Sequence, residues 1–217
     1  MLEFFTFVCE GILLVNILVL LLSIGKTSPH RVLLTYSVFV FVIQAYSHWL
    51  RNSGHNNLYL SHILFPGQCL LLNCFCYLLI DAKILKKILF LLTSILCIVA
   101  GIYILLSPVD PYAFNRMEIF TTNISVIIAL FLYLYDSLGT TRPFRLATIS
   151  LLVYFISSTV IFISGNLLVK FGASTHSIWM LHIGLFFISQ LSITIDTTKQ
   201  LRNNSIWKAW KQRSLLR

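Results

Sequence analysis

Long apolar runs alternate with short polar breaks along most of the sequence. Each run is close to the length of about 20 residues that a helix needs to cross the hydrocarbon core of a bilayer. The breaks contain Gly, Pro and Asn, which are typical of loops, except for the third break, which is marked by charge alone. The predicted spans are Phe4–Ser23, Val32–Leu50, Leu58–Ile80, Ile88–Leu106, Ile119–Tyr135, Leu146–Leu168 and Ile178–Ile195. The pattern predicts an all-α polytopic membrane protein, with a seven-transmembrane helix bundle over residues 1–196 and a tail over residues 197–217.

The composition indicates that lipid is the solvent for most of the chain. Hydrophobic residues make up 58% of the sequence and charged residues 11%. An ordinary soluble domain is about 45–50% apolar and about 25% charged. Seven spans with short loops use nearly all of the 217 residues, which leaves no room for a soluble catalytic domain. We therefore expect no enzyme activity and no cofactor, and we expect any binding site to lie in the bundle, the loops or the tail.

Lys and Arg are distributed unevenly between the two sets of loops. Thirteen fall on the side of the tail, and the other side holds only Arg51, Arg116 and Lys170. Because cytoplasmic loops carry the excess of positive charge, this bias predicts a cytoplasmic C-terminus. An odd number of spans then places the N-terminus outside, in a multi-pass protein of the cytoplasmic (plasma) membrane. The net charge of +9 follows from the same bias. It indicates the lipid bilayer as a partner, and no nucleic-acid signature accompanies it.

The tail has a pattern of its own. Ser205 is placed to cap a short separate helix, with Trp207 and Trp210 on one side and Lys208 and Lys211 around the rest. Basic amphipathic segments with tryptophan lie in the headgroup plane of anionic membranes. The pattern therefore predicts a membrane-surface anchor, and the alternative is a docking site for a cytoplasmic signalling partner.

Polar residues inside the spans fall on single helix faces. Because such residues are costly in hydrocarbon, we expect these faces to turn toward the bundle interior or a wet cavity. Span four is almost free of polar residues, and we expect it to face lipid. The stripes are Ser37, Gln44, Ser47, His48 and Arg51 on span two; His62, Asn73 and Tyr77 on span three; Thr122, Ser125 and Asp136 on span five; Ser150, Tyr154, Ser157 and Ser164 on span six; and His182, Ser189 and Asp196 on span seven.

Histidines are concentrated at the outer ends of the spans. Five of the six lie there, together with Glu3 and Glu10, which are seven residues apart and share a face of span one. An outward-opening pocket of this kind suits a cation, a metal or a polar small-molecule ligand. The alternative is that these side chains are simply wetted at headgroup depth. No fixed set of metal ligands is predicted. The predicted ligand-binding residues are Glu10, Gln44, His48, His62, Asn73 and His182.

Three aspartates mark the inner ends of spans three, five and seven. Asp81, Asp136 and Asp196 each follow a span at its C-terminal end, where a carboxylate opposes the helix dipole. We expect them to pair with the cytoplasmic Lys and Arg, either as topological anchors or as an ionic latch that holds one conformation of the bundle.

Two segments resemble a group of known membrane proteins. Phe144–Phe155 reads FRLATISLLVYF, and Ser177–His182 reads SIWMLH. In these segments, and in size and topology, the chain resembles the small stand-alone seven-transmembrane proteins of bacteria that accompany histidine kinases. The resemblance implies a receptor-like or sensor role in the bacterial inner membrane, in which a ligand or partner binds the outer half of the bundle and a signal passes to a cytoplasmic partner.

A second comparison is with zinc-dependent membrane hydrolases of the ceramidase and adiponectin-receptor type, which also use histidines on helices two, three and seven. Those proteins place Ser three residues before His on helix two, whereas here Gln44 stands four residues before His48. His176 and His182 are six residues apart and cannot share a ligand-bearing face. The pattern thus departs from that family at both positions.

The first alternative to the sensor role is a small-solute transporter with a three-one-three helix plan, and the second alternative is a zinc-dependent membrane hydrolase. Span three ends in Ile80-Asp81-Ala82-Lys83, and span seven ends in the similar Ile195-Asp196-Thr197-Thr198-Lys199. Together with the polar-poor span four, this likeness is compatible with a repeat of spans one to three in spans five to seven.

Overall fold

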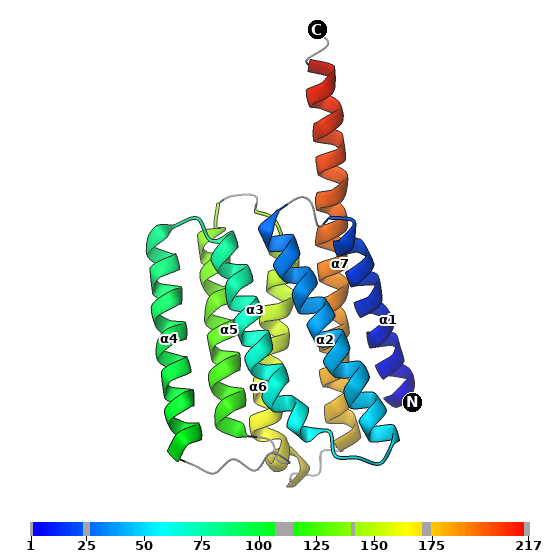
Figure 1. The fold of residues 1–217 in the computed structure, drawn as a ribbon, viewed down its shortest axis with the longest axis vertical. Helices are drawn as coiled ribbons and strands as arrows, with labels where there is room; N and C mark the ends of the chain where they lie inside the picture. Colours follow the sequence, from blue (N-terminus) through cyan, green and yellow to red (C-terminus); the bar gives the residue numbers. More distant parts are fainter. Residues whose placement is uncertain (1, 24–26, 107–114, 140–141, 171–174, 215–217) are drawn as a thin grey trace.

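The computed structural model describes residues 2–23, 27–106, 115–139, 142–170 and 175–214; for residues 2–6, 104–105, 164–170, 175–176 and 203–214 only the backbone is described. These residues form seven α-helices and one turn of 3-10 helix (Figure 1). The elements are α1 (Leu2–Leu21), α2 (Ser28–Asn52), η1 (Leu58–Leu60), α3 (Ser61–Leu79), α4 (Lys83–Leu106), α5 (Arg116–Asp136), α6 (Arg145–Lys170) and α7 (Thr175–Ser214). The all-helical prediction is confirmed for this part of the chain.

Six of the helices are long and apolar enough to cross a membrane. They are α2 to α7, and the stretch of α1 with described side chains, Phe7–Leu21, is apolar but shorter. The distribution of side chains agrees with a lipid solvent. Leu70 and Phe90 are each 71% exposed on the outside, whereas Asn16 and Gln190 are fully buried inside. A membrane protein with transmembrane helices is therefore supported by both length and burial.

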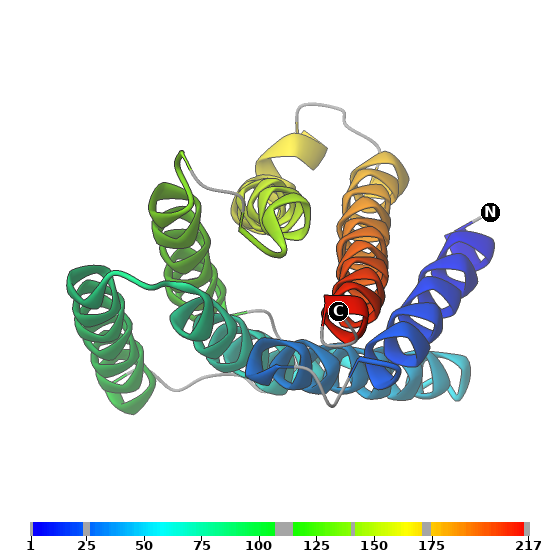
Figure 2. The same ribbon diagram turned by 90° about the horizontal axis from the view of Figure 1, so that it is seen from above.

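The helices form a closed ring of six with one helix outside it. Going round the ring, the packed neighbours are α1, α2, α3, α5, α6 and α7, and α7 closes against α1 (Figure 2). α4 lies outside, where it packs mainly on α5 and more lightly on α3. Only 6% of the apolar part of α4 is buried within the protein. The outward position of this helix agrees with its lack of a polar stripe.

Local chemistry explains where several helices begin and end. Pro29 lies in the first turn of α2, where its missing N–H costs no hydrogen bond. Asn115 caps α5, because its Oδ1 accepts hydrogen bonds from the backbone N–H groups of Met117 at 3.1 Å and Glu118 at 3.2 Å. Beyond α2 the chain turns at Gly54, whose φ of 74° is easily reached only by glycine.

Two predicted boundaries are wrong. α4 begins at Lys83 and not at Ile88, since Lys and Leu are good helix formers and the first turn can extend past the apolar segment. α7 continues without a break to Ser214, where the sequence predicted an end at Ile195 and a new helix capped by Ser205. Ser205 lies inside this helix, because the polar residues after Ile195 contain no Gly or Pro to stop it.

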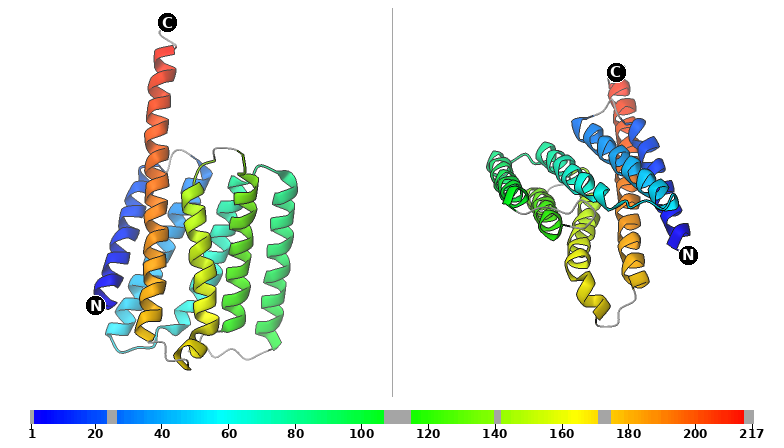
Figure 3. Two further views of the ribbon diagram at one scale, coloured as in Figure 1. Left: turned by 180° about the vertical axis from the view of Figure 1, so that it is seen from behind. Right: turned by 60° about the horizontal axis from the view of Figure 1, so that its bottom comes forward.

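The two ends of the bundle hold different parts of the chain. The start of α1 and the turn of residues 53–57 lie at one end, which we call the N-terminal end (Figure 1). The opposite end, which we call the tail end, holds residues 80–82 between α3 and α4, and residues 137–139 and 142–144 between α5 and α6. From the tail end the last part of α7 projects well past the other helices (Figure 3).

Candidate functional site

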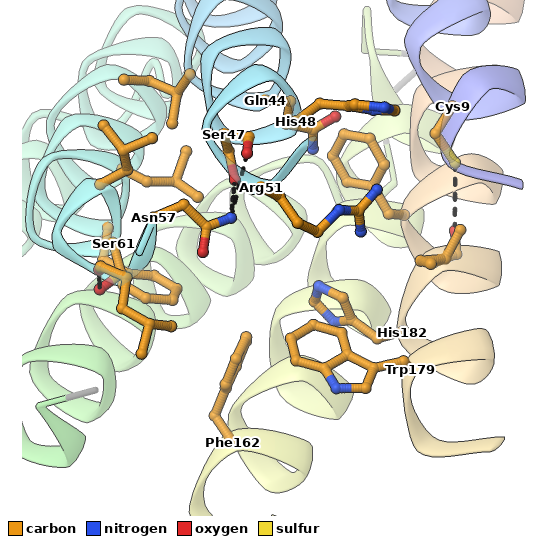
Figure 4. A pocket seen from close by; sticks show the side chains of 17 residues that line it. Cys9, Gln44, Ser47, His48, Arg51, Asn57, Ser61, Phe162, Trp179 and His182 are labelled. Atoms are coloured by element: carbon orange, nitrogen blue, oxygen red, sulfur yellow. Dashed lines mark hydrogen bonds between the residues drawn. The ribbon is translucent and has the colours of Figure 1, made fainter. Parts of the chain in front are cut away.

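A pocket of about 430 Å³ opens at the N-terminal end of the bundle. It lies between α1, α2, α3, α6 and α7, inside the ring, and the turn between α2 and α3 contributes to its wall (Figure 4). The lining residues are Cys9, Ile43, Gln44, Ser47, His48, Arg51, Asn57, Leu58, Leu60, Ser61, Leu64, Phe65, Phe162, Trp179, His182, Ile183 and Phe186. Its volume is in the range of about 300–1,000 Å³ that is usual for small-molecule sites.

The polar stripe of α2 forms one wall. Ser47 and His48 are adjacent, and Gln44 before them and Arg51 after them are three or four residues from each, so a helix presents all four on one side. All four line the pocket. The turn after α2 folds back on this stripe. Asn57 donates hydrogen bonds from Nδ2 to the hydroxyl of Ser47 at 2.6 Å and to its carbonyl at 3.3 Å. The wall is thus held in place by the chain that follows it.

Three of the six predicted ligand-binding residues meet in this pocket, namely Gln44, His48 and His182. A fourth, Glu10, lies behind His48, with its Oε1 3.3 Å from Nδ1 of the imidazole. This distance allows an ion pair whenever the imidazole is protonated. The sequence placed Glu10 and His48 in one group, and the packing of α1 on α2 explains their contact.

His62 and Asn73, the other two predicted ligand-binding residues, are not among the residues that line this pocket. Both lie on the side of α3 that faces α5. Nδ1 of His62 is 2.5 Å from Oε2 of Glu118, in the first turn of α5, and the side chains are only 21% and 7% exposed. The sequence placed His62 at the outer end of its span, yet it carried no signal that His62 pairs with Glu118.

Asn73 joins three helices near the middle of the apolar layer. Its Nδ2 donates to the hydroxyl of Ser125 on α5 at 3.1 Å, and its Oδ1 accepts from the hydroxyl of Thr93 on α4 at 2.9 Å. The contact with Thr93 shows that α4 contributes one polar anchor despite its apolar sequence. Asn73 therefore acts in packing the bundle.

A similar cluster at the junction of α1 and α7 was missed by sequence reasoning. Asn16 donates from Nδ2 to the side-chain oxygen of Gln190 at 2.9 Å and to its carbonyl at 3.0 Å, and its Oδ1 accepts from Thr194. The only signals of this cluster in the sequence were a single Asn within the apolar run of span one and Gln190 within span seven. Neither belonged to a stripe, so the sequence did not mark them.

The wall opposite α2 is aromatic. His182 of α7 lies within a group of rings, with centroid distances of 5.4 Å to Phe162, 5.8 Å to Trp179 and 5.4 Å to Tyr154. The first two contacts are edge-to-face, the arrangement favoured by the ring quadrupoles. Nδ1 of His182 is buried and has no hydrogen-bond partner among the described residues.

The predicted clustering of charge at the inner ends is seen at the tail end. Arg142, in the connection from α5 to α6, pairs with Asp81 and lies 3.7 Å from Asp136. Asp136 also accepts a hydrogen bond from the backbone N–H of Asp81 at 2.8 Å. These contacts tie the start of α4, the end of α5 and the start of α6 together. The hydrogen bond to Asp81 raises the pKa of Arg142, so the guanidinium stays charged throughout the accessible pH range.

Asp196 departs from that prediction. Its carboxylate accepts a hydrogen bond at 2.8 Å from the backbone N–H of Ala147, in the first turn of α6. The unpaired N–H groups and the dipole at this helix N-terminus supply the positive character that the sequence assigned to a Lys or Arg side chain.

Two further expectations concern metal and the tail. Among the described residues no group of three or more His, Cys, Asp or Glu side chains is placed to hold a metal ion. The tail residues Trp207, Lys208, Trp210 and Lys211 are helical within α7, and their side chains lie outside the described part of the chain.

Comparisons with known proteins returned nothing: no family model, no curated protein and no solved structure matches this chain.

Proposed function

We propose that this protein is a receptor-like membrane sensor, in which occupancy of the pocket at the N-terminal end is passed along α7 to the segment beyond the tail end. The observation that carries the proposal is that one helix both lines the pocket and extends beyond the tail end. α7 lines the pocket with Trp179, His182, Ile183 and Phe186, and the same helix continues to Ser214. It projects past the other six helices (Figure 1).

The construction of α7 suits transmission. The helix has 40 residues, which corresponds to a length of about 60 Å at about 1.5 Å per residue. It contains no Pro, the usual cause of a kink that would separate the two ends. A tilt or rotation imposed beside the pocket therefore reaches the projecting segment as a rigid-body movement.

Polar contacts give α7 a defined register against its neighbours. Gln190 is bonded to Asn16 of α1, and Asp196 is bonded to the first turn of α6. Contacts of this kind are either made or broken, so they favour discrete positions of the helix over continuous sliding. The proposed switch is a change between two such positions.

Hydrogen–deuterium exchange in lipid nanodiscs tests this coupling. Leu64→Trp places a large ring in the pocket from α3, and Leu70→Trp adds the same ring to a position on α3 that is 71% exposed on the outside. We expect Leu64→Trp to change exchange in residues 197–214 by about fivefold or more, the lower range of typical coupling between sites.

Leu70→Trp is the matched control and should leave exchange in residues 197–214 as in the unaltered protein. Equal exchange in both variants, with the overall helix content preserved, would show that the pocket and the projecting segment are independent, and the sensor proposal would fall.

A second candidate, the small-solute transporter, is favoured by the position of α4 outside the ring. The remaining helices form two consecutive triads, α1–α3 and α5–α7, which meet at the junctions α3 with α5 and α7 with α1. Each junction carries a buried polar cluster, around Asn73 and around Asn16. If the protein is a transporter, radiolabelled sugars, amino acids or carboxylates should enter proteoliposomes that contain it. Gln44→Ala or Asn73→Ala should abolish this flux.

A further inference from the structure

The pocket has one polar side and one apolar side. The side made by α2 and the following turn presents hydrogen-bonding groups, whereas the side made by α3, α6 and α7 is largely apolar and aromatic. In Figure 4 Arg51 reaches from α2 over the middle of the pocket, between Asn57 and the pair His182 and Trp179. A ligand that fills this space meets a cation at one end and rings at the other.

The fixed charge of the pocket is positive. Arg51 lines it, and among the residues whose side chains the structure describes no Asp or Glu does so. Arg51 forms no salt bridge with any side chain that the structure describes. The nearby carboxylate of Glu10 lies against His48 instead. A guanidinium group has a planar fork of donors that matches a carboxylate with two parallel hydrogen bonds, so the unpaired Arg51 favours an anionic ligand.

A second polar group in the pocket lacks a partner. Nδ1 of His182 is buried without a hydrogen bond among the described residues, and a buried polar atom in this state is destabilising until a partner pairs with it. Figure 4 shows His182 on the side of the pocket toward which Arg51 extends. A ligand oxygen lying between the two side chains would pair with both.

The apolar side suits an elongated or flat hydrocarbon body. Phe162 packs edge-to-face on Trp179 at 6.1 Å and on Phe65 at 5.5 Å. Together with Phe186 these rings form a wall beneath the polar end. Because the pocket opens where α2 ends and α7 begins, a ligand can enter with its polar group at the level of the lipid headgroups.

We propose that this pocket binds a carboxylate-bearing amphiphile, with the carboxylate on Arg51 and the apolar body against Phe162, Trp179 and Phe186. The inference rests on the proposed function only in taking this pocket as the ligand site. It specifies the chemical class of the ligand: a single negative charge on an apolar chain or ring. A fatty acid from the membrane and a soluble aromatic acid share this chemistry.

Binding of matched probes to the full chain in phosphatidylcholine nanodiscs tests the proposal. The acids are decanoate and 4-phenylbutyrate, the neutral partners are decanol and 4-phenylbutanol, and the cation is decylamine, each corrected for uptake by empty nanodiscs. We expect the acids to bind the unaltered protein at least about tenfold more tightly than the alcohols. A tenfold preference is the lower range for a hydrogen bond to a charged group. Preference for decanoate identifies a lipid source, and preference for 4-phenylbutyrate identifies a soluble aromatic source.

Arg51→Gln should remove the preference for acids while leaving the affinity for alcohols unchanged, and Arg51→Lys should retain part of it. Arg116→Gln, at an exposed position at the start of α5 outside the pocket lining, is the matched control and should behave like the unaltered protein. Thermal unfolding of each variant establishes that the bundle is intact.

Three results overturn the ligand class: equal binding of acids and alcohols, tighter binding of decylamine, or no binding of either acid below millimolar concentration. The sensor proposal is judged separately from exchange in residues 197–214. Acid binding without coupling to that segment would remove the sensor role and leave the ligand class standing. Coupling seen with Leu64→Trp, without a preference for acids, would remove the ligand class and leave the sensor role standing.

Discussion

Pairs of polar side chains join neighbouring helices inside this bundle. Asn16 meets Gln190, His62 meets Glu118, and Asn73 meets Ser125. Interhelical hydrogen bonds in membranes contribute only about 0.6 kcal/mol on average. The His62–Glu118 contact differs from the other two, because it contains two ionisable groups and its carboxylate is buried. Removing one partner leaves the other, which is largely buried, without its ionic contact.

We predict that His62 and Glu118 are energetically coupled. His62→Ala and Glu118→Ala, combined in a double-mutant cycle, should give a coupling of on the order of 1 kcal/mol or more. The measurement is the free energy of unfolding in bicelles on titration with sodium dodecyl sulfate. The matched cycle of His62→Ala with Asp136→Asn, at the far end of α5, should be additive. Additive effects for His62 and Glu118 themselves would contradict the pairing.

At the scale of elements, α2 and α3 pack closely where a glycine lies beside an aromatic ring. A Cβ added at Gly67 would lie 2.6 Å from Cε1 of Phe39, closer than real contacts allow. α3 contains Pro66 at this point, so the local backbone already lacks one helical hydrogen bond. The ring of Phe39 and the glycine therefore set the distance between the two helices.

Gly67→Ala should destabilise the bundle by about 1–3 kcal/mol, the usual cost of overpacking an interior. Gly101→Ala on α4 is the matched control, because a Cβ there meets nothing within 4 Å. We expect a lower unfolding midpoint for Gly67→Ala alone, partly restored when Phe39→Leu is added. A midpoint equal to that of Gly101→Ala would show that the ring moves aside freely.

The connections at the tail end depend on an exposed ion pair. Asp81 is 71% exposed and Arg142 is 22% exposed, and pairs of this kind contribute only about 0–1 kcal/mol. The cluster of Arg142, Asp81 and Asp136 thus orders two connections without adding much to global stability. This is the chemistry that a latch requires, since a weak contact is easily released.

At the scale of the whole molecule, the ring encloses a pocket at one end and sends a long helix out at the other. α1 begins at the end that holds the pocket, and α7 ends beyond the opposite end (Figure 1). Opposite ends are what an odd number of crossings produces. We propose seven crossings, with the pocket open to the outside, because thirteen Lys and Arg residues lie on the side of the tail and three on the other.

This orientation predicts the accessibility of tags in intact bacterial cells that express the protein. An epitope tag fused after Arg217 should resist added protease until the cells are lysed. A matched tag inserted after Gly54, in the exposed turn between α2 and α3, should be cleaved without lysis. The opposite result for the two tags would reverse the orientation and direct the pocket to the cytoplasm.

The sequence by itself determined the positions of the helices, the outward face of α4 and the stripe on α2 that reaches the pocket. These features depend on the local periodicity of the sequence and on the cost of placing polar groups in hydrocarbon. Both can be assessed from one amino-acid sequence. It missed the continuity of α7 through Ser205, because a charged, polar segment can extend a helix when no Gly or Pro stops it.

Only the tertiary structure decided which polar side chains meet. His62 and Glu118 are 56 residues apart, and Asn16 and Gln190 are 174 apart. Periodicity places a residue on a helix face, but the neighbour which that face meets depends on the order and rotation of helices in the ring. For this reason His62 and Asn73 turned out to face α5, while Arg51, Trp179 and His182, drawn from helices distant in the sequence, came together around one pocket.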